Sequence, residues 1–184
     1  MNWLLAIYQR RAGAWRKHKA RLPDNLPHRL SDHFYLYELT RSQSAARHAI
    51  PNHPNAKQVA ALRLLCRNVL EPVRRHFKIP IVPSSGFRCL PLNRLLGSSD
   101  SSSHCRGEAL DFEVVGVSNA ALAEWIASNL EFDQLIVEYP QAENGNAGWV
   151  HVSIKAGENR NQCLTRHAYG YVHGLPVFSK RSKP

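Results

Sequence analysis

The longest regular pattern of apolar positions lies between residues 55 and 76. Apolar side chains recur there at alternating steps of three and four residues, and the stripe comprises Val59, Leu62, Cys66, Val69 and Val73. This spacing places them on one face of an α-helix, while the arginines of the same stretch lie largely off that face. The pattern predicts a long amphipathic helix that packs its stripe against a core.

A second helix is predicted from Ser118 to about residue 130. Ser118 is a favourable N-cap, because its hydroxyl oxygen can accept a hydrogen bond from a backbone N–H of the first turn. Leu122, Trp125 and Ile126 then face inward. Residues 92–100 are predicted to form a short helix and a flexible loop.

Three strands are predicted, at Ala109 to Val114, Gln134 to Tyr139 and Trp149 to Ile154. The first and the last alternate between apolar and polar side chains, as half-buried strands do. In the first stretch, Asp111 points away from the most apolar face. In the last, His151 lies opposite the face of Val150 and Val152. A fourth strand, leading into a turn, is predicted at residues 84–88.

The length and hydrophobic content of the chain predict one folded domain with a segment at each end. Its 184 residues are 43% hydrophobic, which suffices for one core and is too little for two full-sized domains. We expect a basic segment at residues 1–30, a folded domain at residues 31–178 and a basic tail at residues 179–184. The four cysteines form no C-x-x-C pair, so reduced thiols are expected.

The net charge of +10 predicts an anionic partner: nucleic acid, an anionic membrane or the acidic polymers of a bacterial envelope. Residues 1–30 hold seven Lys or Arg against one acid, a net of +6. This segment is interpreted as an amphipathic helix on an anionic membrane or wall polymer, as a solvated arm, or as a helix packed on the core. Its apolar residues precede its charges, the reverse of a secretory signal.

Two histidines and one aspartate are the candidate metal ligands. His104 and Asp111 are seven residues apart, and His151 follows forty residues later. Two imidazoles and a carboxylate can hold one zinc ion and leave a coordination position open, as in hydrolytic sites, whereas structural zinc sites are closed by four protein ligands. The pattern therefore favours an enzyme.

Three short motifs stand in order along the chain. They are Ser85-Gly86-Phe87-Arg88, then Ser102-x-His104-x-x-Gly107-x-Ala109-x-Asp111, then Trp149-x-His151. Together they resemble the zinc D-Ala-D-Ala carboxypeptidases and dipeptidases, with the phage peptidoglycan endopeptidases of the same metallopeptidase family, in the carboxypeptidase A-type branch. The resemblance covers roughly residues 34–160.

This resemblance implies an α+β domain with a central antiparallel sheet flanked by helices, the hedgehog and D-Ala-D-Ala peptidase fold. It implies His104, Asp111 and His151 as ligands of one zinc ion, and hydrolysis of a peptide bond that involves a D-amino acid. Arg88 is the expected partner of a substrate carboxylate or of the developing oxyanion, with a structural salt bridge as the alternative. Ser102 is expected near the substrate, or as a cap of its own loop.

The general base departs from the family pattern. Many members carry Asp or Glu three residues before the last histidine ligand, where this chain has Gly148. Glu138, at the end of a predicted strand, is the leading substitute, and Glu143 in the following loop is the second choice. The alternative for Glu138 is a solvated or arginine-paired carboxylate.

We therefore expect a zinc peptidase that cuts peptidoglycan stem peptides, made in the cytoplasm without a signal peptide and acting at the cell wall as a phage or prophage lysis enzyme. Two other functions stay open. A zinc-binding module without catalysis would keep the three ligands and lack the base. A nucleic-acid binder would use residues 1–30, but it leaves the ligand motif unexplained, so no specific nucleic acid is expected.

Overall fold

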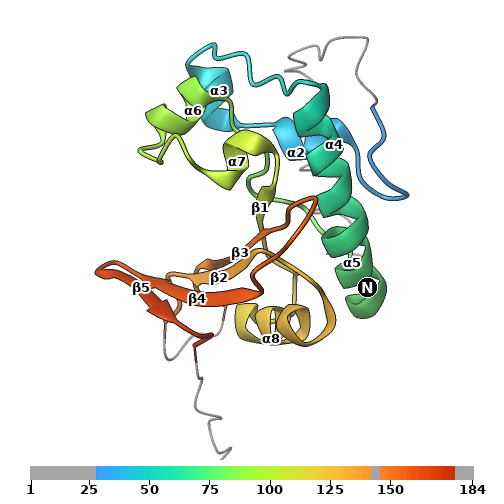
Figure 1. Cartoon of the computed structure of the whole chain (residues 1–184), viewed down its shortest axis with the longest axis vertical. Helices are drawn as coiled ribbons and strands as arrows, with labels where there is room; N and C mark the ends of the chain where they lie inside the picture. Colours follow the sequence, from blue (N-terminus) through green and yellow to red (C-terminus); the bar gives the residue numbers. More distant parts are fainter. Residues whose placement is uncertain (1–27, 142–145, 177–184) are drawn as a thin grey trace, which may run out of the picture.

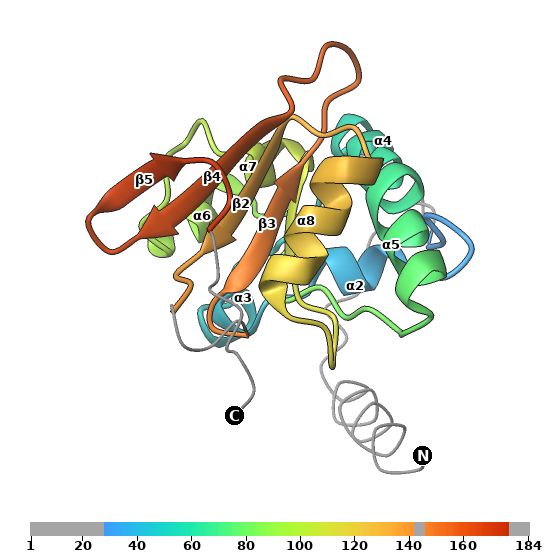
Figure 2. The same ribbon diagram turned by 90° about the horizontal axis from the view of Figure 1, so that it is seen from below.

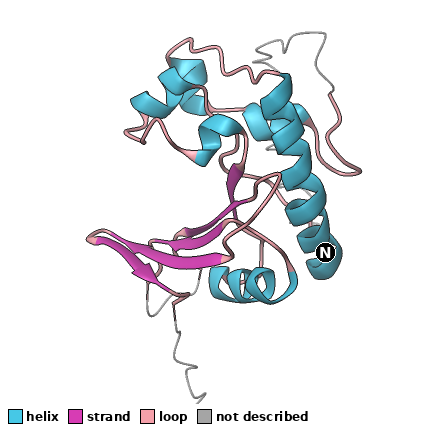
Figure 3. Ribbon diagram, in the orientation of Figure 1, coloured by secondary structure: helices cyan, strands magenta, loops and turns pink. Residues whose placement is uncertain are grey.

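The computed structural model describes residues 28–141 and 146–176, and it confirms the α+β class. The helical elements are α2 Leu36–Thr40, α3 Gln43–Arg47, α4 Ala56–Leu65, the π-helical turn η2 Cys66–Leu70, α5 Glu71–Phe77, α6 Leu90–Leu95, α7 Ser103–Arg106 and α8 Asn119–Asn129. The strands are β1 Ala109–Phe112, β2 Gln134–Glu138, β3 Trp149–Ser153, β4 Gln162–His167 and β5 Gly170–His173 (Figures 1 and 3). The predicted helix near the N-terminus and the basic tail lie outside the described residues.

The strands form one five-stranded sheet in the order β1-β3-β2-β4-β5. Three of its four pairings are antiparallel, as expected, and β2 pairs with β4 in parallel. The parallel pair arises because β3 returns antiparallel beside β2, and the chain then crosses to the other side of β2 as β4. The residues of β4 and β5 are mostly half-buried or exposed and show no clear alternation, so the sequence predicts neither strand.

The two faces of the sheet differ in polarity. Residues paired across neighbouring strands lie on the same face, and His151 pairs with both Asp111 and Ile136. The opposite face is apolar and buried, and its members are Leu110, Phe112, Val150, Val152, Leu135 and Val137. Helix α8 lies on this apolar face, and α6 and α7 lie over the polar one (Figures 1 and 2). The candidate ligands therefore share a face that the core does not use.

The predicted helix over residues 55–76 is confirmed. Elements α4, η2 and α5 follow one another without a break, and every residue of the apolar stripe is at most 3% exposed. Asn55 caps the start, since its side-chain oxygen accepts a hydrogen bond from the Gln58 N–H. Ser118 caps α8 in the same way, as predicted, by accepting a hydrogen bond from the Ala121 N–H.

The strand predicted at residues 84–88 is wrong beyond a single residue. Ser85 forms an isolated bridge with Asp111, at the edge of β1. The chain then leaves the sheet, because the Phe87 N–H donates to the Leu39 carbonyl oxygen at 2.7 Å instead of continuing the ladder. This departure sends Arg88 toward the polar face.

The four cysteines are free, in agreement with the predicted thiols. Within the part of the chain that the structure describes, no helix has the length and apolar character needed to cross a bilayer.

A cluster of charges around Asp133 joins the start of β2 to the segment after β3. Its carboxylate accepts hydrogen bonds from Arg160 and lies 2.6 Å from the Lys155 ammonium nitrogen. These cations, Arg160 above all, outweigh the effect of burial and lower the pKa of Asp133 to about 2. A lowered folded-state pKa contributes stability that is complete above the unfolded pKa near 3.8 and is lost as pH falls toward 2.

We therefore expect Asp133→Asn to lower the free energy of unfolding at pH 7 by about 1 kcal/mol, a modest value because solvent screens both partly exposed cations. Denaturant unfolding of both proteins at pH 7 and pH 3 tests this, and the difference should narrow at the lower pH. An equal difference at both pH values would contradict the role of this ion pair.

Candidate metal centre

His104 lies on α7, a single helical turn that follows the loop after α6. The Ser102 hydroxyl oxygen accepts a hydrogen bond from the His104 N–H at 3.3 Å and caps this turn. Gly107 ends it with φ +73°, and a Cβ there would lie 2.6 Å from the Gln58 carbonyl oxygen. Both the left-handed backbone and the close approach require glycine, so Gly107 permits the reversal from α7 into β1.

The orientation of the His104 ring is set by a backbone carbonyl. Its Nδ1 lies 2.7 Å from the Gly86 carbonyl oxygen, which can only accept, so Nδ1 carries the proton. The other nitrogen, Nε2, then carries the lone pair. It lies 3.3 Å from Oδ1 of Asp111. Such a hydrogen bond on the far nitrogen is the usual support of a metal-binding histidine.

The three predicted ligands converge. Oδ1 of Asp111 also lies 2.8 Å from Nδ1 of His151, and one donor atom from each of the three side chains lies within 4.8 Å of the others. All three residues are at most 7% exposed. Two imidazole nitrogens and one carboxylate oxygen suit zinc, whose ligand bonds of about 2.0–2.2 Å can span this cluster with small shifts of the rings.

The protonation states suit a cation. Burial lowers the pKa of His104, which favours the neutral imidazole that a metal requires. For Asp111, burial alone would raise the pKa, but the neighbouring rings of His104 and His151 outweigh it and hold the pKa well below its ordinary value. The cluster therefore presents one negative charge and a neutral nitrogen donor in a buried place.

Arg88 approaches the cluster from behind the carboxylate. Its Nη2 donates to Oδ2 of Asp111 at 2.7 Å, and its Nε donates to Oγ of Ser85 at 2.9 Å. The side chain is 15% exposed. Asp111 thus turns one oxygen toward the histidines and the other toward Arg88, so the arginine orients the ligand. A contact between Arg88 and substrate stays a prediction.

Asn52 holds the segment that carries Arg88, a role that the sequence analysis missed. Its Nδ2 donates to the Phe87 carbonyl oxygen at 2.9 Å, and its Oδ1 accepts from the Cys89 N–H at 2.7 Å. Asn52 is buried, and these partners flank Arg88. They lie 35 and 37 residues away along the chain, so no local pattern reveals them.

Ser102 serves as the cap of α7, which is the second of the two roles expected for it. Its side chain is half-buried beside the His104 backbone. A contact with substrate is an untested prediction for this residue.

Glu138 ends β2 on the polar face of the sheet. It is 8% exposed, and it forms an ion pair with Arg166 whose Nη1 lies 3.6 Å from Oε2. Burial raises the pKa of Glu138 and the charge of Asp111 adds to this rise, while His151 and Arg166 oppose it. A buried carboxylate with a perturbed pKa beside a ligand cluster is a candidate proton acceptor. Glu143, the second choice, lies outside the described residues.

Gly148 stands at the position where the resemblance implies an Asp or Glu, and the backbone leaves no room for a side chain there. Its φ is +74°, and a Cβ there would lie 1.7 Å from the Glu138 carbonyl oxygen. Asn119, at the start of α8, binds this turn, because its Nδ2 donates to the Gly148 carbonyl oxygen at 3.0 Å. The turn before β3 therefore excludes any side chain at position 148, so no carboxylate that could serve as a general base fits at this position.

We expect Gly148→Ala to lower the free energy of unfolding by about 2–4 kcal/mol, since the left-handed φ and the collision with backbone add together. Gly116→Ala is the matched control, because Gly116 has φ +79° and no heavy atom within 4 Å of a Cβ. Its cost should be about 1 kcal/mol, from backbone strain alone. Denaturant unfolding measures both variants. If both lose the same free energy of unfolding, a Cβ at position 148 does not collide with the Glu138 carbonyl oxygen.

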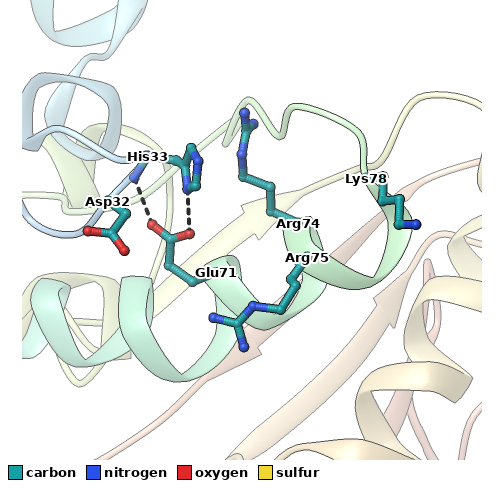
Figure 4. Close-up of a pocket in the computed structure, with 6 residues that line it drawn as sticks. All are labelled: Asp32, His33, Glu71, Arg74, Arg75 and Lys78. Atoms are coloured by element: carbon teal, nitrogen blue, oxygen red, sulfur yellow. Dashed lines mark hydrogen bonds and ion pairs between the residues drawn. The ribbon is translucent and has the colours of Figure 1, made fainter.

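A pocket beside α5 is lined by none of the three candidate ligands (Figure 4). Its carboxylate, Glu71, accepts hydrogen bonds from Oγ of Ser31 and from the backbone N–H of His33, and pairs with the His33 ring. The cations around it, Arg74, Arg75 and Lys78, project in different directions (Figure 4). These contacts attach residues 31–33 to α5 and form no convergent site.

A family model described as Peptidase M15 matches residues 32–153, a span that includes all three ligands and Glu138. No curated protein matches the chain.

Proposed function

Because the chain belongs to the peptidase M15 family, the zinc D-Ala-D-Ala carboxypeptidase family of metallopeptidases, we propose that it is a zinc-dependent peptidase of peptidoglycan stem peptides. The observation that carries the proposal is the convergence of His104, Asp111 and His151, with Glu138 on the same face of the sheet. A set of metal ligands with a buried carboxylate on the same face is an arrangement that suits metal-dependent peptide hydrolysis.

The fit between the cluster and zinc assigns a role to each ligand. Nε2 of His104, Oδ1 of Asp111 and Nδ1 of His151 would hold the ion. When bound, zinc supplies Lewis-acid chemistry, because it polarises a carbonyl group and makes water a stronger acid. Arg88 keeps Asp111 oriented through its hydrogen bond to Oδ2.

Glu138 moves the proton. Its carboxylate takes a proton from the attacking water and delivers it to the nitrogen of the leaving amine, which balances the hydrolysis of one peptide bond. Partial burial suits this role, since it brings the pKa of Glu138 closer to neutrality than that of an exposed glutamate. The low exposure of the polar face also strengthens charge interactions there.

The proposed substrate, peptidoglycan, rests on the family and on charge. The net charge of +10 favours an anionic polymer, and residues 1–30 carry +6 of it. We propose that the protein acts at the bacterial cell wall as a lysis enzyme of phage or prophage origin, and that its basic segment keeps it on the wall or on an anionic membrane.

Digestion of purified peptidoglycan tests this function. The zinc-loaded protein and the same protein after removal of its metal by a chelator are incubated with the polymer. Mass spectrometry then gives the masses of the released fragments. We expect metal-dependent release of stem-peptide fragments whose masses name the bond and separate a carboxypeptidase from an endopeptidase. Release of nothing by a protein that retains zinc would instead support a binding module without catalysis.

A further inference from the structure

A second arginine lies on the face of the sheet that carries the ligands. Arg166 of β4 pairs in register with Glu138 of β2, and Glu138 pairs with Trp149 of β3. Cross-strand partners share a face, so Arg166 lies on the side of His151 rather than on the side covered by α8. Neither the sequence pattern nor the three motifs single it out.

The guanidinium of Arg166 is held by two aromatic rings. Its central carbon lies 5.4 Å from the ring centre of Tyr139 and 5.2 Å from that of Tyr171. Its Nη1 also donates to the Tyr171 hydroxyl oxygen at 2.9 Å. These contacts restrict a long side chain before any ligand arrives, which lowers the entropic cost of binding.

Arg166 is accessible where Arg88 is not. The Arg166 side chain is 39% exposed, against 15% for Arg88, whose Nε and Nη2 are engaged by Ser85 and Asp111. The Arg166 ion pair with Glu138 is 3.6 Å long, beyond hydrogen-bond range, so it leaves donors of the fork to another acceptor. A planar guanidinium fork matches a carboxylate in two parallel hydrogen bonds.

The distance between the ligand cluster and Arg166 indicates where along a bound peptide the carboxylate that Arg166 binds would lie. His151 and Arg166 lie on strands that are two strand spacings apart, about 10 Å, and they are offset by two residues along the strands, about 7 Å. The two positions are therefore about 12 Å apart. An extended peptide advances about 3.3–3.6 Å per residue. A peptide cut at the cluster would therefore bring a group three or four residues from the scissile bond to Arg166.

We propose that Arg166 is a specificity residue that binds a free carboxylate of the substrate peptide three or four residues from the bond that is cut. This inference rests on the proposed peptidase function and adds to it a substrate class: stem peptides that are acidic at that position, in preference to those in which the same group is an amide.

The test compares two synthetic stem peptides that differ only in carboxylate or amide at this position. The zinc-loaded wild type should cut the acidic peptide with a kcat/KM at least about tenfold higher, mainly through KM, as expected for loss of one charge-assisted contact. Arg166→Gln should bring the ratio close to one, mainly by raising KM for the acidic peptide. Any change in kcat that comes from the lost ion pair with Glu138 should be the same for both peptides. Arg94→Gln is the control, because Arg94 is exposed on α6 and pairs with Asp100.

Three results would overturn the inference. The first is a wild type that cuts both peptides with the same kcat/KM. The second is a preference for the acidic peptide that persists in Arg166→Gln. The third is a loss of kcat in Arg166→Gln that is equal on both peptides with no change in the preference, which would mean that Arg166 acts only through Glu138. If the wild type cuts neither peptide, the proposed function fails separately, and calorimetric binding of the same pair decides the role of Arg166. The inference is supported if the wild type binds the acidic peptide more tightly than the amide peptide and Arg166→Gln removes this difference. Equal affinity of the wild type for the two peptides contradicts it.

Discussion

Replacement of His151 by alanine is expected to abolish metal-dependent hydrolysis and to lower zinc affinity by more than about 100-fold. Loss of a group that only supports a ligand already costs about 10–100-fold in metal affinity, and His151 supplies one of three converging donor atoms. Zinc content after dialysis and the hydrolysis rate of a stem peptide measure the two effects.

Two matched variants separate a ligand from its support and from an ordinary histidine. Arg88→Ala removes the hydrogen bond to Oδ2 of Asp111 and leaves all three donors, so its loss of zinc affinity should fall within about 10–100-fold. His53→Ala changes an exposed histidine and should bind zinc like the wild type. Full zinc content in His151→Ala would contradict the ligand assignment.

Replacement of Glu138 by glutamine is the second large effect. It keeps the size of the side chain and removes its ability to accept a proton, so kcat should fall by about 10²–10⁴-fold, the usual contribution of a general base. Zinc content should stay at the wild-type level, because Glu138 is not among the three converging donors. Initial rates at saturating peptide, with metal analysis of the same sample, measure both.

Glu113→Gln is the control for this substitution. Glu113 follows β1 and is exposed, so its loss should leave kcat unchanged. Full activity of Glu138→Gln would move the base to another group, with Glu143 the next residue to replace.

The sequence predicted the elements whose stability comes from local pattern. The stripe of α4 to α5 and the alternation of β1 and β3 repeat with the period of their element, and this identified them. The half-buried character expected of the first strand is wrong, because β1 is buried on both faces. The sequence did not predict β4, where Cys163, Leu164 and Thr165 are flanked by polar residues, because this strand is held by its parallel pairing with β2. Pairing between strands that are distant in the chain does not require a regular apolar pattern in the sequence of the strand.

The site shows the same division. His104, Asp111 and His151 were recognisable because the motifs that contain them resemble those of the zinc D-Ala-D-Ala carboxypeptidase family. The supports of the site were not recognisable. The Gly86 carbonyl oxygen that orients His104, and Asn52, which holds the Arg88 segment, act through contacts between distant parts of the chain. The exclusion of a side chain at Gly148 also needs three-dimensional structure, because its neighbour is a backbone oxygen of another strand.

Zinc titration of the metal-free protein, with the hydrolysis rate of one stem peptide as the readout, tests the metallopeptidase assignment most directly. We expect the rate to rise from near zero in proportion to added zinc and to reach a plateau at about one ion per chain, the number that one cluster of three ligands can hold. A rate that stays at zero while the protein binds its zinc would contradict catalysis at His104, Asp111 and His151.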